Sequence, residues 1–196
     1  MKREFIYRIF SKIPQLETDR LILRKMLVSD AADMYEYARR PDVTKFLTWN
    51  PHPNQTYTRN YLEYVATKYA TGNFYDWAVI EKVSGHMIGT CGFTRFDFQS
   101  NGAELGYVIN PDYRGQGYAP EAAEAVMKFA FDELGVVRLE ANYMEGNLAS
   151  RRVMEKLGMT YEGMRRRSML VRNQYKNICV CSILIDEYKN NKACLV

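Results

Sequence analysis

Arg114-Gly115-Gln116-Gly117-Tyr118-Ala119 is the stretch that decides the fold, because it joins two segments of different periodicity. Residues 103–109 have the apolar pattern of a strand, and residues 120–134 repeat small and apolar side chains at helical spacing. Glycines let a ligand approach the backbone closely, and the first turn of a helix carries N–H groups without a helical partner, at the positive end of the dipole. The stretch therefore predicts a phosphate cradle at a helix start, with an ordinary glycine turn as the alternative.

Two widespread nucleotide-binding motifs do not fit this stretch. A dinucleotide fingerprint needs Gly-x-Gly-x-x-Gly or Gly-x-Gly-x-x-Ala directly after a strand, whereas this chain has Pro120 in the last place and residues 110–114 in between. A P-loop needs Gly-Lys-Ser or Gly-Lys-Thr, and the chain contains neither. Pro120 instead suits the first turn of a helix, where its missing N–H costs little.

The composition indicates one compact domain without a linker. Of the 196 residues, 47% are hydrophobic and 26% are charged, which is enough apolar material for a sizeable core. We expect a single domain over residues 15–188, preceded by an amphipathic extension at 1–14 and followed by a tail at 189–196. The net charge of +4 favours an anionic ligand but is too small to indicate nucleic-acid binding, so no DNA partner is expected.

The cysteines and the N-terminal segment give expectations about compartment and partners. Cysteines at positions 91, 179, 181 and 194 form no Cys-x-x-Cys pair, so we expect reduced thiols, no metal site and a cytoplasmic protein. Phe5, Ile6, Ile9, Phe10 and Ile13 recur at helical spacing among basic residues. Such a helix can lie on a membrane, but this one is short, and docking onto the domain or a second subunit is the preferred interpretation. We therefore expect no membrane partner, and a monomer or a homodimer.

The periodicity along the chain alternates between strands and helices. We expect a strand at 20–26, then a lid of two helices at 29–40 and 56–70 around the loop 48–53, and then antiparallel strands at 74–82, 86–98 and 103–109. The helix at 120–134 leads to a parallel strand at 136–143, a helix at 147–157 and a hairpin of strands at 159–171 and 174–185. The expected fold class is α+β, a mixed α/β fold with a central, mostly antiparallel sheet of about seven strands flanked by about four helices.

Five stretches in chain order resemble one protein family. Arg114, Gly117 and Ala119 fill the Arg/Gln-x-x-Gly-x-Gly/Ala signature of the GCN5-related N-acetyltransferases (GNAT). The others are Glu-Thr-Asp-Arg-Leu-Ile-Leu-Arg at 17–24, Ala-Glu-Leu-Gly-Tyr at 103–107, Asn-x-x-Ser at 147–150 and Glu-Lys-Leu-Gly-Met at 155–159. The sequences of these stretches resemble those of the RimJ/RimL-like branch, which acetylates the N-termini of ribosomal proteins. The resemblance spans about residues 17–187 and implies the GNAT fold, with one splayed parallel pair of strands, and acetyl-CoA as co-substrate.

The resemblance also implies where the coenzyme binds. Its pyrophosphate lies on backbone N–H groups of the cradle, its pantetheine arm pairs with the strand at 107–109, and an N–H near Val108 polarises the thioester carbonyl. Such an arm needs an open strand edge, and the alternative is that this edge pairs with 136–143 throughout. Glu121 and Glu124 are tolerable near the phosphates only if they point away. The implied coenzyme-binding residues are Tyr107, Val108, Ile109, Arg114, Gly115, Gln116, Gly117, Tyr118, Ala119, Asn147 and Ser150.

Glu104 and Ser150 are the candidate catalytic residues. Glu104 shares a strand face with small and apolar residues, where desolvation raises the pKa of a carboxylate towards the range of a general base. A solvated or ion-paired carboxylate is the alternative. Asn147 is expected to cap its helix by accepting from the Ser150 amide. The resemblance further implies that Asn147 contacts the coenzyme arm and that Ser150 donates a proton to the leaving thiolate, since Met154 stands where many members have tyrosine.

The acceptor side carries fewer signals. Trp49, His52, Tyr75 and Trp77 fall in or after the lid and are candidates for contact with the acceptor, with simple packing as the alternative. The basic run at 165–167, with Arg172 and Lys176 nearby, contacts RNA or an acidic acceptor in one interpretation and is a solvated strand end in the other.

The leading hypothesis is an acetyl-CoA-dependent N-acetyltransferase that acts on a primary amine by direct transfer in a ternary complex, because no Cys-His or Ser-His pairing is suggested. The acceptor is the N-terminus of a ribosomal protein, with ribosome association, or a small molecule such as a polyamine, an amino acid or an aminoglycoside. Residues 173–177 read Asn-Gln-Tyr-Lys-Asn where relatives often carry an acidic residue. This difference weakens the case for a protein N-terminus as the acceptor. A non-catalytic module that binds coenzyme A or RNA is the alternative from another class.

Overall fold

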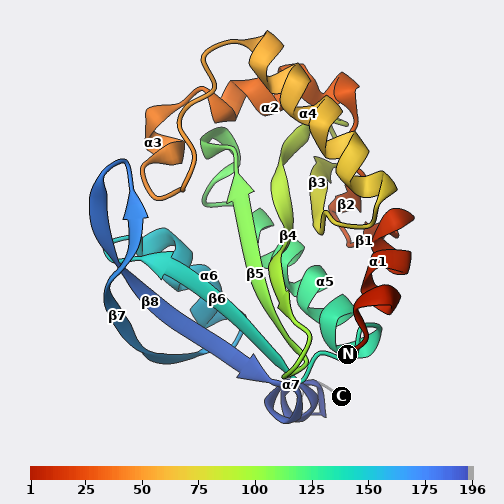
Figure 1. The fold of residues 1–196 in the computed structure, drawn as a ribbon, viewed down its shortest axis with the longest axis vertical. Helices are drawn as coiled ribbons and strands as arrows, with labels where there is room; N and C mark the ends of the chain where they lie inside the picture. Colours follow the sequence, from red (N-terminus) through yellow and green to blue (C-terminus); the bar gives the residue numbers. More distant parts are fainter. Residues whose placement is uncertain (194–196) are drawn as a thin grey trace.

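A twisted sheet of eight strands organises the chain (Figure 1). The computed structural model describes residues 1–193. The strands are β1 (Leu16–Glu17), β2 (Leu21–Arg24), β3 (Asp76–Glu81), β4 (Met87–Asp97), β5 (Gly102–Ile109), β6 (Arg138–Met144), β7 (Thr160–Val171) and β8 (Gln174–Leu184). Their order in the sheet is β1-β2-β3-β4-β5-β6-β8-β7, and β5 with β6 is the parallel pair. The expected fold class is confirmed. The additional strand, β1, is only two residues long and has no periodic signal.

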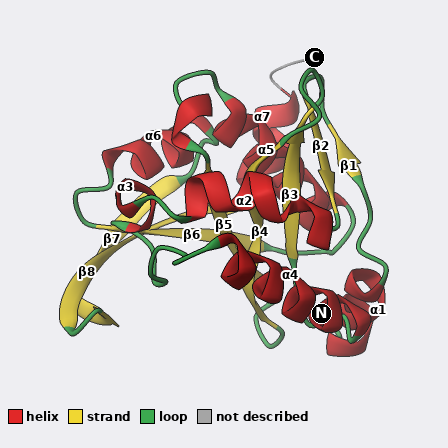
Figure 2. Ribbon diagram, turned by 90° about the horizontal axis from the view of Figure 1, so that it is seen from above, coloured by secondary structure: helices red, strands yellow, loops and turns green. Residues whose placement is uncertain are grey.

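Seven α-helices flank the sheet in the part of the chain that the structure describes. They are α1 (Arg3–Ser11), α2 (Ala31–Ala38), α3 (Pro41–Thr44), α4 (Gln55–Ala70), α5 (Tyr118–Asp132), α6 (Leu148–Lys156) and α7 (Ile185–Ala193), with short 3-10 turns η1 (Val28–Asp30) and η2 (Pro111–Tyr113). Figure 2 shows α4 on one side of the sheet and α5, α6 and α7 on the other. Pro41 begins α3 as its first residue, so it starts a helix as well as ending the previous one.

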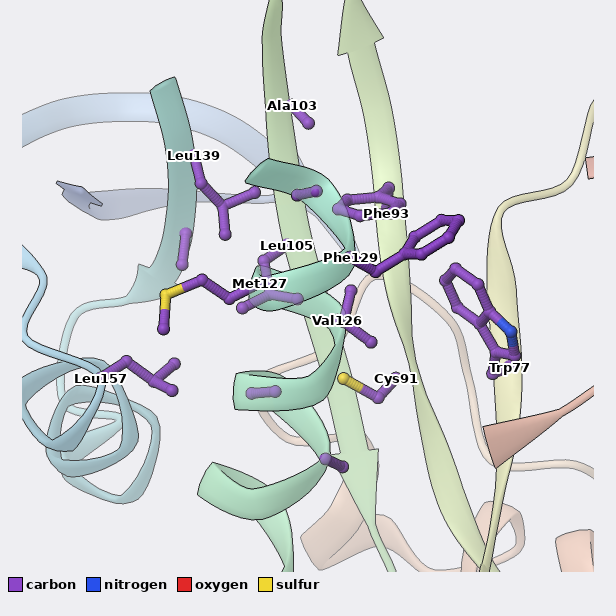
Figure 3. Packing of buried hydrophobic residues seen from close by; sticks show 14 of the residues in the cluster. Trp77, Cys91, Phe93, Ala103, Leu105, Val126, Met127, Phe129, Leu139 and Leu157 are labelled. Atoms are coloured by element: carbon purple, nitrogen blue, oxygen red, sulfur yellow. The ribbon is translucent and has the colours of Figure 1, made fainter. Parts of the chain in front are cut away.

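The alternation of strand side chains builds two cores, one on each face of the sheet. Val126, Met127 and Phe129 of α5 pack on Leu105 and Cys91 in the larger core (Figure 3). The smaller core lies under α2 and α4 and includes Tyr37, Val65, Tyr69 and Ala78. Because successive residues of a strand point to opposite faces, Trp77 faces the larger core and Ala78 the smaller one.

Helix α1 is docked onto the larger core. Ile6 and Phe10 are fully buried, and Phe10 contacts five aromatic rings, those of Tyr75, Trp77, Phe93, Phe96 and Phe129. The helical spacing at the N-terminus therefore belongs to a segment that packs on the domain.

The predicted tail at 189–196 overlaps the last helix, α7. Residues 185–193 form α7, and residues 194–196, including Cys194, lie outside the described part. The thiols of Cys91, Cys179 and Cys181 are buried and unpaired. None of the helices within residues 1–193 combines the length and the apolar character that crossing a membrane requires.

Strands β5 and β6 separate halfway along their length, as Figure 1 shows. Their parallel pairing runs from Gly102 opposite Arg138 to Leu105 opposite Ala141. Beyond this point β5 continues to Ile109 along β4, whereas β6 continues along β8. The strand edge from residue 106 to 109 is therefore open towards β6, which is the geometry that an added, strand-like ligand requires.

Candidate active site

Two glycines in the left-handed conformation shape the turn before α5. Gly115 has φ +78° and Gly117 has φ +84°, values that other residues adopt at a cost of about 1–2 kcal/mol. Gly117 caps α5, and the Glu121 N–H donates to its carbonyl oxygen at 3.2 Å. The N–H groups of residues 116–119 precede this bond, so they have no acceptor in the helix. The turn thus presents the unpaired donors that a phosphate cradle needs.

The acidic residues Glu121 and Glu124 in the first two turns of α5 are directed away from the cradle. Glu121 accepts from Thr18 Oγ1 at 2.6 Å and from Arg20 Nε at 2.7 Å. Burial raises the pKa of Glu121, but these hydrogen bonds outweigh burial and lower the pKa overall. Arg20 also donates to the Gln116 carbonyl oxygen at 2.9 Å, which fixes the turn. Glu121 and Glu124 face a separate shallow cavity formed with residues 15–19.

The open edge of β5 presents the N–H groups of two of its residues. The Asn110 N–H donates to the Ile88 carbonyl oxygen in β4 at 2.7 Å. Because N–H groups alternate between the two sides of a strand, the Val108 N–H also faces β4, whereas those of Tyr107 and Ile109 face the open edge. The structure therefore places the neighbours of Val108, and not Val108, where a thioester carbonyl could be polarised.

A pair of hydroxyl groups joins the open edge of β5 to α6. Tyr107 OH lies 2.9 Å from Ser150 Oγ and donates to the Ser150 carbonyl oxygen at 3.1 Å. The Ser150 N–H donates to Asn147 Oδ1 at 3.2 Å, so Asn147 caps α6 as its sequence position predicts. Burial raises the pKa of Tyr107, so its hydroxyl stays protonated at neutral pH. This pair can relay a proton, and the involvement of Tyr107 in it was missed because only the folded chain brings residues 107 and 150 together.

Glu104 faces the central cavity and is ion-paired. Arg95 Nε lies 2.6 Å from Glu104 Oε2. A bulge in β4 between Phe93 and Arg95 inserts Thr94 and brings Arg95 opposite Glu104. The structure thus shows the ion pair that the sequence left open as an alternative, in a carboxylate that still lines the cavity.

One cavity of about 680 Å³ connects the open edge of β5 with the space under the lid. Trp49, His52 and Tyr75 line it, together with Glu104, Tyr107 and Ser150. His52 is buried, its Nδ1 lies 2.9 Å from Thr58 Oγ1, and burial lowers its pKa, so the ring is neutral at neutral pH. Three of the four predicted acceptor-side residues therefore border the same cavity.

Trp77 lies elsewhere. Its side chain is fully buried in the larger core against Phe10, and its indole N–H donates to the Pro14 carbonyl oxygen at 2.7 Å. The alternation of β3 turns Trp77 away from the cavity, so we leave it out of the proposed acceptor site.

Arg172 fastens the lid to the last hairpin. It sits in the turn between β7 and β8 with φ +49°, and its guanidinium donates to the carbonyl oxygens of Thr44 at 2.7 Å and Trp49 at 2.8 Å and to Asn50 Oδ1 at 2.9 Å. In Figure 1 the tip of this hairpin lies beside the loop that follows α3. Arg172 therefore fixes residues 44–50, which form the roof of the cavity. The basic run at 165–167 is exposed.

Asp76 is a charged cavity residue that sequence reasoning missed. It begins β3 and borders the cavity on the side of α2 and α4. The available signal was its place two residues before Ala78 and four before Ile80, both buried on the same strand face. Within residues 1–193, the structure has no group of three or more His, Cys, Asp or Glu side chains arranged to hold a metal ion.

The family follows from comparison with known proteins. The model of the acetyltransferase (GNAT) domain matches residues 20–160. An uncharacterised N-acetyltransferase, p20, from Bacillus licheniformis is 30% identical over 173 residues, which cover 88% of this chain and 97% of that protein. The chain belongs to the GNAT acetyltransferase family.

Other GNAT relatives agree with this assignment. The crystal structure of a GNAT acetyltransferase from Bacillus anthracis has a TM-score of 0.79 at 29% identity and covers 89% of this chain and 100% of that one. A putative ribosomal N-acetyltransferase, YdaF, from Bacillus subtilis is 26% identical over 75% of this chain and 79% of its own length. The protein is thus an acetyl-CoA-dependent N-acetyltransferase, and the acceptor is an amine.

Proposed function

We propose that this GNAT enzyme transfers acetyl from acetyl-CoA directly to a primary amine in a ternary complex. The observation that carries the proposal is the meeting of three features around residues 106–109. The unpaired N–H groups before α5 suit a pyrophosphate, the open edge of β5 suits the pantetheine arm, and the cavity under the lid reaches the same strand. The bound thioester supplies the activated acetyl group.

The side chains at this strand have distinct roles in the proposal. The N–H groups of Tyr107 and Ile109 polarise the thioester carbonyl, and Glu104, held by Arg95, accepts a proton from the amine directly or through water. The Ser150 and Tyr107 hydroxyls pass a proton to the leaving thiolate. The C–N bond forms as the C–S bond breaks, and one proton of the original ammonium is released to solvent.

Two acceptor classes are supported by different observations. The sequences of the five stretches and the similarity to YdaF support a protein N-terminus as the acceptor, including that of a ribosomal protein. The extent of the cavity beneath the lid, down to Asp76 on β3, supports a small amine. We propose the cytoplasm as the compartment, in keeping with the unpaired thiols.

The test measures coenzyme binding and thiol release separately. We expect calorimetry to detect coenzyme A binding, and Glu104→Gln to leave that affinity unchanged while lowering kcat about 100-fold. Glu140→Gln is the matched control. Glu140 is on β6, and its carboxylate lies 3.7 Å from the guanidinium of the same Arg95. We expect this substitution to leave kcat unchanged. Unchanged turnover in Glu104→Gln removes this residue from the mechanism. Coenzyme binding without thiol release across free amines and peptides that begin with Ala or Ser supports the non-catalytic module instead.

A further inference from the structure

Asp76 lines the cavity and has an unpaired carboxylate oxygen. Its Oδ1 is shielded from solvent and has no hydrogen-bond partner in the structure, and the hydroxyl of Tyr37 shares both properties. Both residues line the cavity, Asp76 from β3 and Tyr37 from α2. Shielded polar atoms without partners are costly, so two at one place indicate a site that a polar group of a ligand completes.

Two glycines line the cavity between Asp76 and β5. Asp76 pairs with Gly92 across β3 and β4, and Gly92 pairs with Gly106 across β4 and β5. A Cβ atom at Gly92 would lie 2.8 Å from Asp76 Oδ1 and closer still to the Tyr75 carbonyl oxygen and to Asp76 Cα. Asp76, Gly92 and Gly106 all line the cavity, which therefore runs across the sheet from the carboxylate to β5.

The charge of the lining favours a cationic occupant. Among the described residues that line the cavity, Asp76 and Glu104 are the charged ones, and neither Lys nor Arg borders it. Arg95 forms an ion pair with Glu104, whereas no Lys, Arg or His among the described residues forms an ion pair with Asp76.

The groups around Asp76 are neutral. Burial raises the pKa of Asp76 to about 7, and hydrogen bonds from Thr90 and the Trp77 amide oppose this only in part. The ionisable groups that face it are the hydroxyls of Tyr37 on α2 and of Tyr61 and Tyr69 on α4, and burial raises the pKa of each. The thiol of Cys91 on β4, whose pKa burial also raises, lies on the opposite face of the sheet. An ammonium group entering the cavity would thus meet one uncompensated carboxylate.

The spacing of the strands decides which ammonium group this is. The backbones of Asp76 and Gly106 are two strand spacings apart, about 10 Å, and the Asp76 carboxylate extends over Gly92 towards β5. A general base must come within about 3 Å of the proton that it takes, directly or through one water. Glu104 lies on β5 itself and is therefore better placed than Asp76 to serve the reacting nitrogen, so we infer a different cationic group as the partner of Asp76.

We propose that Asp76 binds a second ammonium group of the acceptor, so that the preferred substrate is a small diamine or oligoamine. This inference rests on the proposed function and adds the substrate class. The reacting nitrogen lies at β5, the second nitrogen lies at Asp76 within about 10 Å of it, and the chain between them lies in the cavity that both strands border. Trp49, His52 and Tyr61 line the walls with ring surfaces suited to methylene groups and to cations.

The experiment compares amines of equal length that differ at the far end. Linear α,ω-diamines are assayed against monoamines that carry a methyl or hydroxyl group there, with the wild type and with Asp76→Asn. We expect the wild type to prefer diamines by at least tenfold in kcat/KM. The variant should lose that preference through a higher KM for diamines, with kcat and the monoamine rates unchanged.

A binding measurement supplies a readout independent of turnover. A saturating diamine should raise the thermal midpoint of the wild type and should not raise that of Asp76→Asn, and the midpoint without ligand shows that the variant is folded. Equal rates for both amine types in the wild type, or an equal loss for both in the variant, overturns the inference while leaving the proposed function intact. Rejection of free diamines with acceptance of peptides that carry a lysine near the N-terminus also overturns it. Absence of thiol release with every amine refutes the proposed function itself.

Discussion

Replacement of Phe10 by alanine tests whether α1 is part of the core. The ring is fully buried and packs against five other rings, so its loss leaves a cavity between α1, β3 and α5. Substitutions of this kind cost about 3–5 kcal/mol, and the edge-on aromatic contacts place the expected value in the upper half of that range. For a chain of this size, each kcal/mol corresponds to roughly 2–4 °C in the unfolding midpoint, so we expect Tm to fall by about 8–20 °C.

Urea unfolding followed by circular dichroism gives the free energy of unfolding, with Phe5→Ala as the matched control. Phe5 lies on the same helix but is only partly buried, so both variants share the small gain in helix propensity and differ in burial. We expect Phe5→Ala to lose less than half as much free energy as Phe10→Ala. Equal losses below about 1 kcal/mol would show that α1 is a loosely attached extension and would refute this reasoning.

Three further substitutions address the cradle, the lid and a buried carboxylate. Gly117→Ala should weaken coenzyme A binding about tenfold by calorimetry, because its φ is left-handed at the cradle, while Gly85→Ala carries the same backbone strain elsewhere and should not. Arg172→Ala should raise the acceptor KM several-fold with an unchanged coenzyme Kd, and Arg166→Ala serves as an exposed control. Asp76 has a pKa of about 7 when folded and about 4 when unfolded, so the folded state binds the proton more tightly and loses stability as pH rises from 4 to 7. The thermal midpoint of Asp76→Asn should therefore rise relative to that of the wild type over this range, and a constant difference would contradict the raised pKa.

Local patterns were sufficient to predict most of the fold. The strand and helix periods around the glycine turn gave the crossover from β5 through α5 to β6, and the cap of α6 by Asn147 follows from its residue type and place. The open edge of β5 was a requirement of the family resemblance, and the pairing between β5 and β6 fulfils it.

The parts that could not be predicted depend on contacts between distant residues. Arg95 meets Glu104 because of one extra residue in β4, and a bulge has no reliable signature in a single sequence. Trp77 is in the core because α1 docks beside it, more than sixty positions away. The Asp76 carboxylate is shielded from solvent because Gly92, which has no side chain, leaves room for it. The sequence of β3 alone contains no signal of this contact.

The anchoring of the lid by Arg172 has a consequence for the order in which the molecule matures. The roof over the cavity is contributed by residues 44–50, but its fastening comes from a turn more than 120 positions later. In a nascent chain that emerges from its N-terminus, the contact between Arg172 and residues 44–50 can form only after the final hairpin has emerged and paired. The same hairpin supplies Cys179, Cys181 and Ile183 to the larger core, so a chain that stops short of it lacks both this contact and part of the core beside β6.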